Sequence, residues 1–137
     1  MKKCTFIGRR DCTNIEPIIY SSVNTLLRQG VNEFYSGGMG NFDILCEKAV
    51  KKSGGIITYI PYNTKLIKER DRLWYDNIFC PFSDKTYSKY DIPNRNKWLV
   101  DNTDICLCYV YKEGGAMSTY DYALKKNKQI INLYYYI

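Results

Sequence analysis

Apolar residues along the chain follow two alternating spacings. Short runs rich in β-branched, aromatic and cysteine residues predict strands at residues 3–7, 31–35, 56–60, 104–111 and 129–133. Between these runs apolar residues recur every three or four positions, which predicts helices over residues 15–29, 42–50, 95–101 and 119–126. Residues 62–92 are rich in Tyr, Lys, Asp and Asn, and within them only residues 78–80 resemble a strand.

This alternation predicts an α/β fold with three layers. Strands separated by helices pair in parallel through right-handed crossovers, and the helices then cover both faces of the sheet. The continuous apolar character of residues 105–110 is typical of a central strand that is buried on both sides. Because 137 residues is the length of one domain, we expect a mostly parallel central sheet in a single domain over residues 1–137.

Three glycine-containing turns follow predicted strands. They are Ile7-Gly8-Arg9-Arg10-Asp11, Ser36-Gly37-Gly38-Met39-Gly40-Asn41-Phe42-Asp43 and Glu113-Gly114-Gly115-Ala116-Met117-Ser118-Thr119. Glycine lets the backbone approach a ligand closely, and a following helix N-terminus offers unpaired N–H groups that favour a phosphate. In a parallel sheet such turns meet beyond the carboxyl ends of the strands, where ligands bind. The turns therefore predict a pocket for an anionic, nucleotide-like ligand.

The charge and hydropathy narrow the classes of partner. The net charge of +6 suits an anionic partner. However, the Lys and Arg residues are scattered along the chain, which is also typical of an ordinary solvated surface. No apolar run reaches the length of a membrane-spanning helix, and the N-terminal residues lack the apolar segment of a signal peptide. We therefore expect a cytoplasmic protein without membrane contact.

The absence of histidine and the spacing of six cysteines limit the chemistry. Neither a Ser-His-Asp nor a Cys-His apparatus can form, so acid–base chemistry falls to a carboxylate, Tyr, Cys or Lys. No cysteine belongs to a C-x-x-C pair, and we expect neither a metal site nor a cofactor. Cys4, Cys106 and Cys108 lie in predicted strands, where a free cysteine behaves as a small core residue.

Most candidate ligand-binding residues come from the three turns. Asp43 either accepts from a ribose hydroxyl or caps its own helix, and Ser118 and Thr119 either donate to a phosphate or cap the following helix. At least one of Arg9 and Arg10 is expected to face the anion, with Asp11 orienting it. The predicted ligand-binding set is Gly8, Arg9, Arg10, Gly37, Gly38, Met39, Gly40, Asn41, Asp43, Arg95, Gly114, Gly115, Ala116, Ser118 and Thr119.

Four segments in order resemble small stand-alone proteins of the SLOG family. They are residues 4–11 (CTFIGRRD), 34–43 (FYSGGMGNFD), 95–98 (RNKW) and 114–116 (GGA), and the similarity extends over nearly the whole chain. This superfamily of Rossmann-like domains includes the lonely-guy cytokinin-activating hydrolases and the DNA-processing protein A family. The resemblance implies a Rossmann-like fold, a nucleotide or nucleotide-sugar pocket and often a homodimer or larger assembly. It also places Arg95 near the ligand, where a guanidinium binds phosphate through two parallel hydrogen bonds, the alternative being a surface salt bridge.

The chain departs from the hydrolase pattern at two positions. Lonely-guy hydrolases carry Pro-Gly-Gly-x-Gly-Thr-x-x-Glu, and the Glu takes part in catalysis. Here Tyr122 stands three residues after Thr119, and the neighbouring acid is Asp121. At the first turn, where close relatives commonly read Gly-His-Arg-Asp, Arg9 replaces the histidine. The resemblance therefore does not imply phosphoribohydrolase activity.

Three functions follow, in this order. The first is binding of a nucleotide-derived small molecule, such as ADP-ribose or a cyclic ADP-ribose-like signal, by a sensor or sequestering protein, with viral removal of a defence signal as one setting. The second is an N-glycosidase or phosphoribohydrolase in which Asp43, Asp121 or Glu47 supplies the carboxylate. The third is single-stranded nucleic-acid binding, which the dispersed basic residues do not favour.

Overall fold

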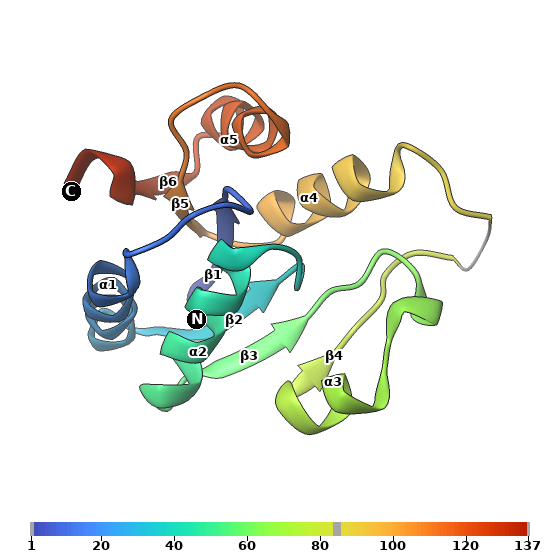
Figure 1. Ribbon diagram of the computed structural model, residues 1–137, viewed down its shortest axis with the longest axis horizontal. Coiled ribbons are helices and arrows are strands. Elements are labelled where there is room, and N and C mark those ends of the chain that lie inside the picture. The colour runs from blue at the N-terminus through green and yellow to red at the C-terminus, as the bar shows by residue number, and fades with distance from the viewer. Residues whose placement is uncertain (1, 84–85, 137) are drawn as a thin grey trace.

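The computed structural model describes residues 2–83 and 86–136, so residues 1, 84, 85 and 137 of the predicted domain lie outside the description. Within the described residues the strands form a six-stranded sheet in the order β4-β3-β2-β1-β5-β6, and every pairing is parallel (Figure 1). The strands are β1 (Lys2–Gly8), β2 (Val31–Ser36), β3 (Ile56–Tyr59), β4 (Asn77–Ile78), β5 (Ile105–Tyr109) and β6 (Gln129–Asn132). The predicted α/β fold with a parallel central sheet is confirmed.

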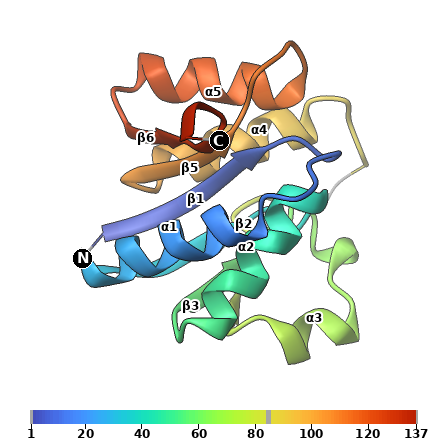
Figure 2. The ribbon, with the colours of Figure 1, turned by 60° about the vertical axis from the view of Figure 1, so that its left-hand side comes forward.

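Helices cover both faces of the sheet. They are α1 (Glu16–Arg28), α2 (Asn41–Lys52), α3 (Glu69–Trp74), α4 (Asp91–Asp101) and α5 (Gly115–Lys125), with short 3-10 helices η1 (Thr64–Leu66) and η2 (Leu133–Tyr136). In Figure 2 α4 and α5 lie above the strands, whereas α1 and α2 lie below them. No helix among the described residues combines the length and apolar character needed to cross a membrane.

The central strand β5 is buried on both faces, as its apolar sequence predicts. Ile105 and Leu107 pack in the core beneath α1 and α2, whereas Cys106 and Cys108 pack against α4 and α5. Alternate side chains of a strand point to opposite faces, so an uninterrupted apolar run serves both layers. The register of β1 and β5 pairs Gly8 with Tyr109, which brings the turns after these two strands side by side.

Two helices begin earlier than the hydrophobic pattern predicts. Helix α5 begins at Gly115 instead of Thr119, so Ser118 and Thr119 belong to the helix and neither is its N-cap. Helix α4 begins at Asp91 instead of Arg95, and Asp91 Oδ2 accepts from the backbone N–H of Ser88 at 2.8 Å. Pro93 lies in the first turn of α4, where a missing N–H breaks no helical hydrogen bond. This correction moves Arg95 from the first position of the predicted helix to the second turn of α4.

The region between β3 and α4 is more regular than its sequence indicates. It contains η1, α3 and the two-residue strand β4, which begins one residue before the predicted strand at 78–80. Buried Glu47 on α2 accepts hydrogen bonds from Ser36 Oγ, Trp74 Nε1 and Tyr75 OH at 2.5, 3.1 and 2.8 Å. These bonds connect α3 to the sheet and to α2, and the hydrophobic pattern of the sequence does not predict them.

Gly8 is required by packing, because a Cβ atom there would overlap the ring of Phe42, which is buried on α2. We expect Gly8→Ala to lower the free energy of unfolding by about 1–3 kcal/mol through overpacking. Urea denaturation measures this change. Gly115→Ala is the matched control, since a Cβ atom added there would meet no atom within 4 Å, and it should stay within about 0.5 kcal/mol of the native protein. Equal effects of the two substitutions would contradict the packing argument.

Candidate ligand-binding site

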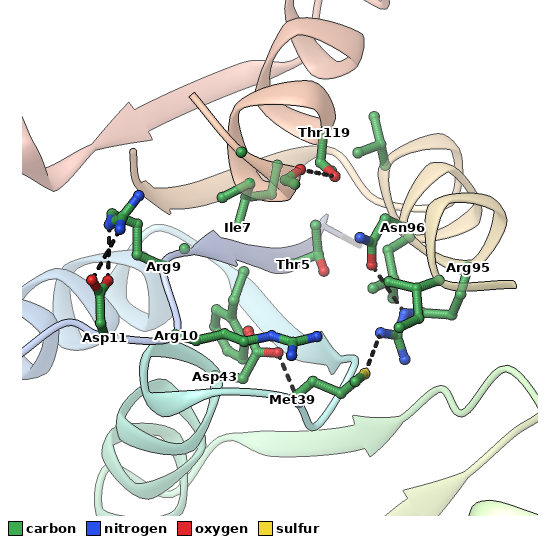
Figure 3. A pocket seen from close by; sticks show the side chains of 18 of the residues that line it. Thr5, Ile7, Arg9, Arg10, Asp11, Met39, Asp43, Arg95, Asn96 and Thr119 are labelled. Atoms are coloured by element: carbon green, nitrogen blue, oxygen red, sulfur yellow. Dashed lines mark hydrogen bonds and ion pairs between the residues drawn. The ribbon is translucent and has the colours of Figure 1, made fainter. Parts of the chain in front are cut away.

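A cavity of about 470 Å³ lies at the carboxyl ends of β1 and β5. From β1 the chain builds β2, β3 and β4 on one side, and it then returns to build β5 and β6 on the other. The strand order therefore reverses between β1 and β5, which is where open α/β sheets bind ligands. The wall is formed by β1 and the turn after it, α2, α4 and the N-terminus of α5 (Figure 3).

The structure brings ten of the fifteen predicted residues to this cavity. They are Gly8, Arg9, Arg10, Met39, Asp43, Arg95, Gly114, Gly115, Ala116 and Thr119. Five others do not line it: Gly37, Gly38, Gly40, Asn41 and Ser118. Asp11 also borders the cavity, as expected of a residue that orients an arginine. Their roles in binding a ligand stay predictions.

The second glycine turn uses its amides within the protein. The N–H of Gly38 donates to Ser36 Oγ at 3.0 Å, that of Met39 to Asp43 Oδ2 at 3.1 Å, and that of Asn41 to the Arg10 carbonyl at 3.3 Å. Gly40 has a φ of +85°, and a Cβ there would lie 2.6 Å from Arg10 Cγ. Gly37 and Gly40 therefore make room for arginine side chains, and Gly38 makes room for tyrosine rings. The three amides have partners already.

The third glycine turn is open to the cavity. Gly114 is the N-cap of α5 with a φ of +145°, and added Cβ atoms at Gly114 and Gly115 would meet no atom within 4 Å. The first amides of a helix lack the carbonyl partners that later amides have, and they carry the positive end of the helix dipole. The N-terminus of α5 thus presents N–H groups and open space to the cavity.

Arg95 is placed differently from either prediction. Its side chain is 2% exposed, so it forms no surface salt bridge, and Nη1 donates to the carbonyls of Gly37 and Ile60 at 3.0 and 3.1 Å. Nε donates to Asn96 Oδ1 at 3.0 Å, and Nη2 lies 3.2 Å from Met39 Sδ. Burial lowers the pKa of Arg95, and the charge of Asp43 opposes this effect. Nε and Nη1 are engaged within the protein and Nη2 contacts Met39 Sδ, so the guanidinium does not offer two parallel bonds to one phosphate.

The two arginines of the first turn differ. Arg9 forms a bidentate ion pair with Asp11, with both N···O distances at 2.9 Å, and its guanidinium lies 4.9 Å from the ring centre of Tyr111. Arg10 extends across the cavity in Figure 3, and within residues 2–83 and 86–136 its guanidinium has no hydrogen bond or ion pair. Arg10 is therefore the cation best placed to meet an incoming anion.

Asp43 lies in the first turn of α2 and also lines the cavity (Figure 3). Its Oδ2 accepts from the N–H of Met39, which precedes the N-cap residue Gly40, and its bond to a ribose hydroxyl stays a prediction. Burial raises the pKa of Asp43 to about 7, while the Met39 N–H and the charges of Arg95 and Arg10 act in the opposite direction. Near neutral pH this carboxyl group is therefore divided between its protonated and ionised forms.

The other two candidate carboxylates lie elsewhere. Glu47 accepts three hydrogen bonds behind the second turn, and burial raises its pKa while those bonds lower it. Asp121 is exposed on α5 and does not line the cavity. Of the three carboxylates, only Asp43 lines the cavity. The described residues contain no cluster of three or more acidic or cysteine side chains that suits a metal ion.

Several residues of the wall are absent from the predicted ligand-binding set. They are Thr5, Ile92, Asn96, Leu99, Lys112 and Glu113. Thr5, Asn96 and Glu113 lie within segments that the sequence singled out, and Lys112 directly precedes the third glycine turn, so position beside a motif was the available signal. The lining residues include four cationic side chains and three acidic ones: Arg9, Arg10, Arg95 and Lys112 against Asp11, Asp43 and Glu113. Protonation of Asp43 increases the net positive charge of the cavity.

Solved structures share this fold. DNA processing protein A from Streptococcus pneumoniae matches 94% of the chain with a TM-score of 0.76 and 15% identity, and its Helicobacter pylori counterpart matches 94% with a TM-score of 0.75 and 18% identity. The molybdenum cofactor binding protein from Rippkaea orientalis matches 96% with a TM-score of 0.68 and 18% identity. These structures share the α/β fold of this chain, and the predicted Rossmann-like fold is confirmed.

The coverage and identities limit this likeness to the fold. The chain spans 49% of the S. pneumoniae protein and 63% of the H. pylori protein, but 75% of the cofactor binding protein. No protein-family model and no curated protein sequence matches the chain. The comparisons therefore show the fold of this chain and assign no ligand to its cavity.

The raised pKa of Asp43 makes stability depend on pH. The unfolded chain loses this proton near pH 3.8, whereas the native state keeps it to about pH 7, so the ionisation of Asp43 destabilises the fold as pH rises through this window. Asp43→Asn removes the effect. The free energy of unfolding of the variant minus that of the native protein should rise between pH 4 and 7. The rise should reach up to about 4 kcal/mol, at 1.36 kcal/mol per pKa unit. Urea titrations across this range test it, and parallel pH curves would refute it.

Proposed function

We propose that this chain is a single SLOG-like domain that binds an anionic, nucleotide-derived small molecule such as ADP-ribose or a cyclic ADP-ribose-like signal. The observation that carries the proposal is the convergence of the unpaired Arg10 guanidinium and the open N-terminus of α5 on one cavity at the strand-order reversal. A phosphate between them receives a full positive charge from one side and helix amides from the other.

The size and lining of the cavity support a small organic anion. Its volume of about 470 Å³ falls within the usual range of small-molecule sites, about 300–1,000 Å³. Apolar side chains of α4, among them Ile92 and Leu99, also line the cavity and suit an uncharged ring. One fold neighbour is named for binding the molybdenum cofactor and another for binding single-stranded DNA, so the fold accommodates ligands of more than one class.

Sequestration or sensing is the action that such binding would supply. A protein that holds a nucleotide signal in this cavity lowers its free concentration, and removal of a defence signal by a virus is one setting in which this action is useful. Assembly as a homodimer or larger homo-oligomer is part of the proposal. Light scattering on the purified chain measures the mass of the assembly, and a monomer at all concentrations would refute that part.

Arg10→Ala tests the binding proposal. Loss of an unpaired guanidinium that meets a phosphate should weaken binding of ADP-ribose or the best ligand of a nucleotide panel about tenfold or more. Isothermal calorimetry at constant salt measures the dissociation constants. Arg28→Ala is the matched control, because Arg28 is exposed in the last turn of α1 and does not line the cavity. Absence of binding below millimolar by every panel member would refute the proposal.

A second function, N-glycoside hydrolysis of a nucleotide, is favoured by one observation. Asp43 lines the cavity with a pKa of about 7, which suits a group that gives and accepts protons near neutral pH. In such a reaction water attacks the anomeric carbon, the bond to the base breaks, and the base leaves with a proton. A carboxylate beside the anomeric carbon stabilises the positive charge that develops on the sugar.

Incubation with AMP, a cytokinin nucleotide or NAD, followed by chromatography of the released base, tests this second function. We expect Asp43→Asn to lower any hydrolysis by the native protein at least about a hundredfold, the usual contribution of acid–base catalysis. Asp121→Asn is the control, since Asp121 is exposed on α5 outside the cavity. Unchanged substrates after long incubation with concentrated native protein would exclude hydrolysis and leave the binding proposal intact.

A further inference from the structure

Asn96 on α4 lines the cavity opposite Arg10, and its amide group is held in one orientation. The side-chain oxygen accepts a hydrogen bond from Arg95 Nε at 3.0 Å (Figure 3). A guanidinium carries only donors, so the atom of Asn96 that faces it must be the oxygen. An asparagine at an open surface offers a donor or an acceptor, because its amide group can rotate by 180°. Here such a rotation would place the NH₂ group of Asn96 against the N–H of Arg95, so that two donors would face each other.

Arg95 itself has no freedom to release this bond. Its guanidinium is buried and donates to the carbonyls of Gly37 and Ile60, at the ends of β2 and β3. The backbone of Gly37 passes so close that a Cβ there would lie 2.8 Å from Arg95 Cζ. Two carbonyls and a tight backbone contact therefore fix the plane of the guanidinium, and the guanidinium fixes the amide of Asn96.

The amide nitrogen of Asn96 consequently points into the cavity. Figure 3 shows Nδ2 on the side away from Arg95, and the described part of the chain contains no acceptor for it. Ile92 and Leu99 of the same helix flank this part of the wall. A phosphate against these carbon atoms would lose hydration without compensation, whereas a flat ring buries favourably there.

We propose that Asn96 determines which organic group the cavity accepts. It donates from Nδ2 to a ring nitrogen or carbonyl oxygen of an uncharged heterocycle, while Arg10 and the N-terminus of α5 bind the phosphate of the same molecule. This inference rests on the proposed binding function. Because the amide cannot turn over, the site disfavours a ring that presents only donors at this point, since two donors would then face each other without a partner.

Asn96→Ala separates recognition of the ring from recognition of the phosphate. Calorimetry with two probes, ADP-ribose and inorganic pyrophosphate, should show about tenfold weaker binding of ADP-ribose and unchanged binding of pyrophosphate. Asn94→Ala is the matched control, because Asn94 is an exposed asparagine of the same helix outside this cavity. Equal weakening of both probes, or no change in either, would overturn the role of Asn96.

A second measurement uses the native protein and does not depend on how a variant folds. The side-chain amide signals of Asn96 in a ¹⁵N-labelled sample, assigned by their loss in Asn96→Asp, should shift with ADP-ribose and stay in place with pyrophosphate. Unmoved signals at saturating ADP-ribose would refute the inference while leaving the binding function standing. If neither probe binds the native protein, the proposed function fails and this inference fails with it.

Discussion

The buried guanidinium of Arg95 is the interaction on which the cavity depends. It joins the carbonyls of Gly37 and Ile60, which belong to different crossovers, to the helix that carries it. An uncompensated buried charge costs about 3–5 kcal/mol, so these carbonyls and the nearby charge of Asp43 are needed to keep the arginine inside. Removal of this contact would separate α4 from the ends of β2 and β3 and disrupt the part of the cavity wall that α4 forms.

The same arrangement explains why the glycine turns differ in their use. Gly8, Gly37 and Gly40 lie where a Cβ would meet the side chain of Phe42, Arg95 or Arg10, so their role is to let large groups pass close to the backbone. Gly114 and Gly115 face open space at the start of α5. Glycine next to a cavity thus arises from two separate causes, close packing and ligand access, and only the second requires a ligand.

The charge of the cavity depends on the protonation state of Asp43. Asp43 is poised near neutrality because burial favours its protonated form while Arg10 and Arg95 favour its ionised form. An anion that draws the field of Arg10 to itself adds negative charge near the carboxyl group, and both effects raise the pKa of Asp43 further. If the proposed anion binds here, its binding and the uptake of a proton by Asp43 would therefore be linked.

The linear sequence was sufficient to predict the fold, and ten of the fifteen candidate residues that it named line one cavity. The alternating hydrophobic periods identified the long helices and strands. The apolar run of β5 identified the central strand, because burial on both faces favours an apolar residue at every position. The element ends were less visible, as α4 and α5 show, since the first helical turn needs no apolar residue. The short α3 and β4 depend on the bonds of Trp74 and Tyr75 to Glu47, which are 27 and 28 residues apart in sequence.

Which atoms face the cavity was decided by tertiary structure alone. The sequence identified Arg95 as a residue of the site, yet its hydrogen bonds are taken by Gly37 and Ile60, 58 and 35 residues away. Asn96 became a fixed donor only through that arrangement. Local patterns report burial and backbone conformation, because both are properties of neighbouring residues. The direction of a donor depends on partners that only the folded chain brings together.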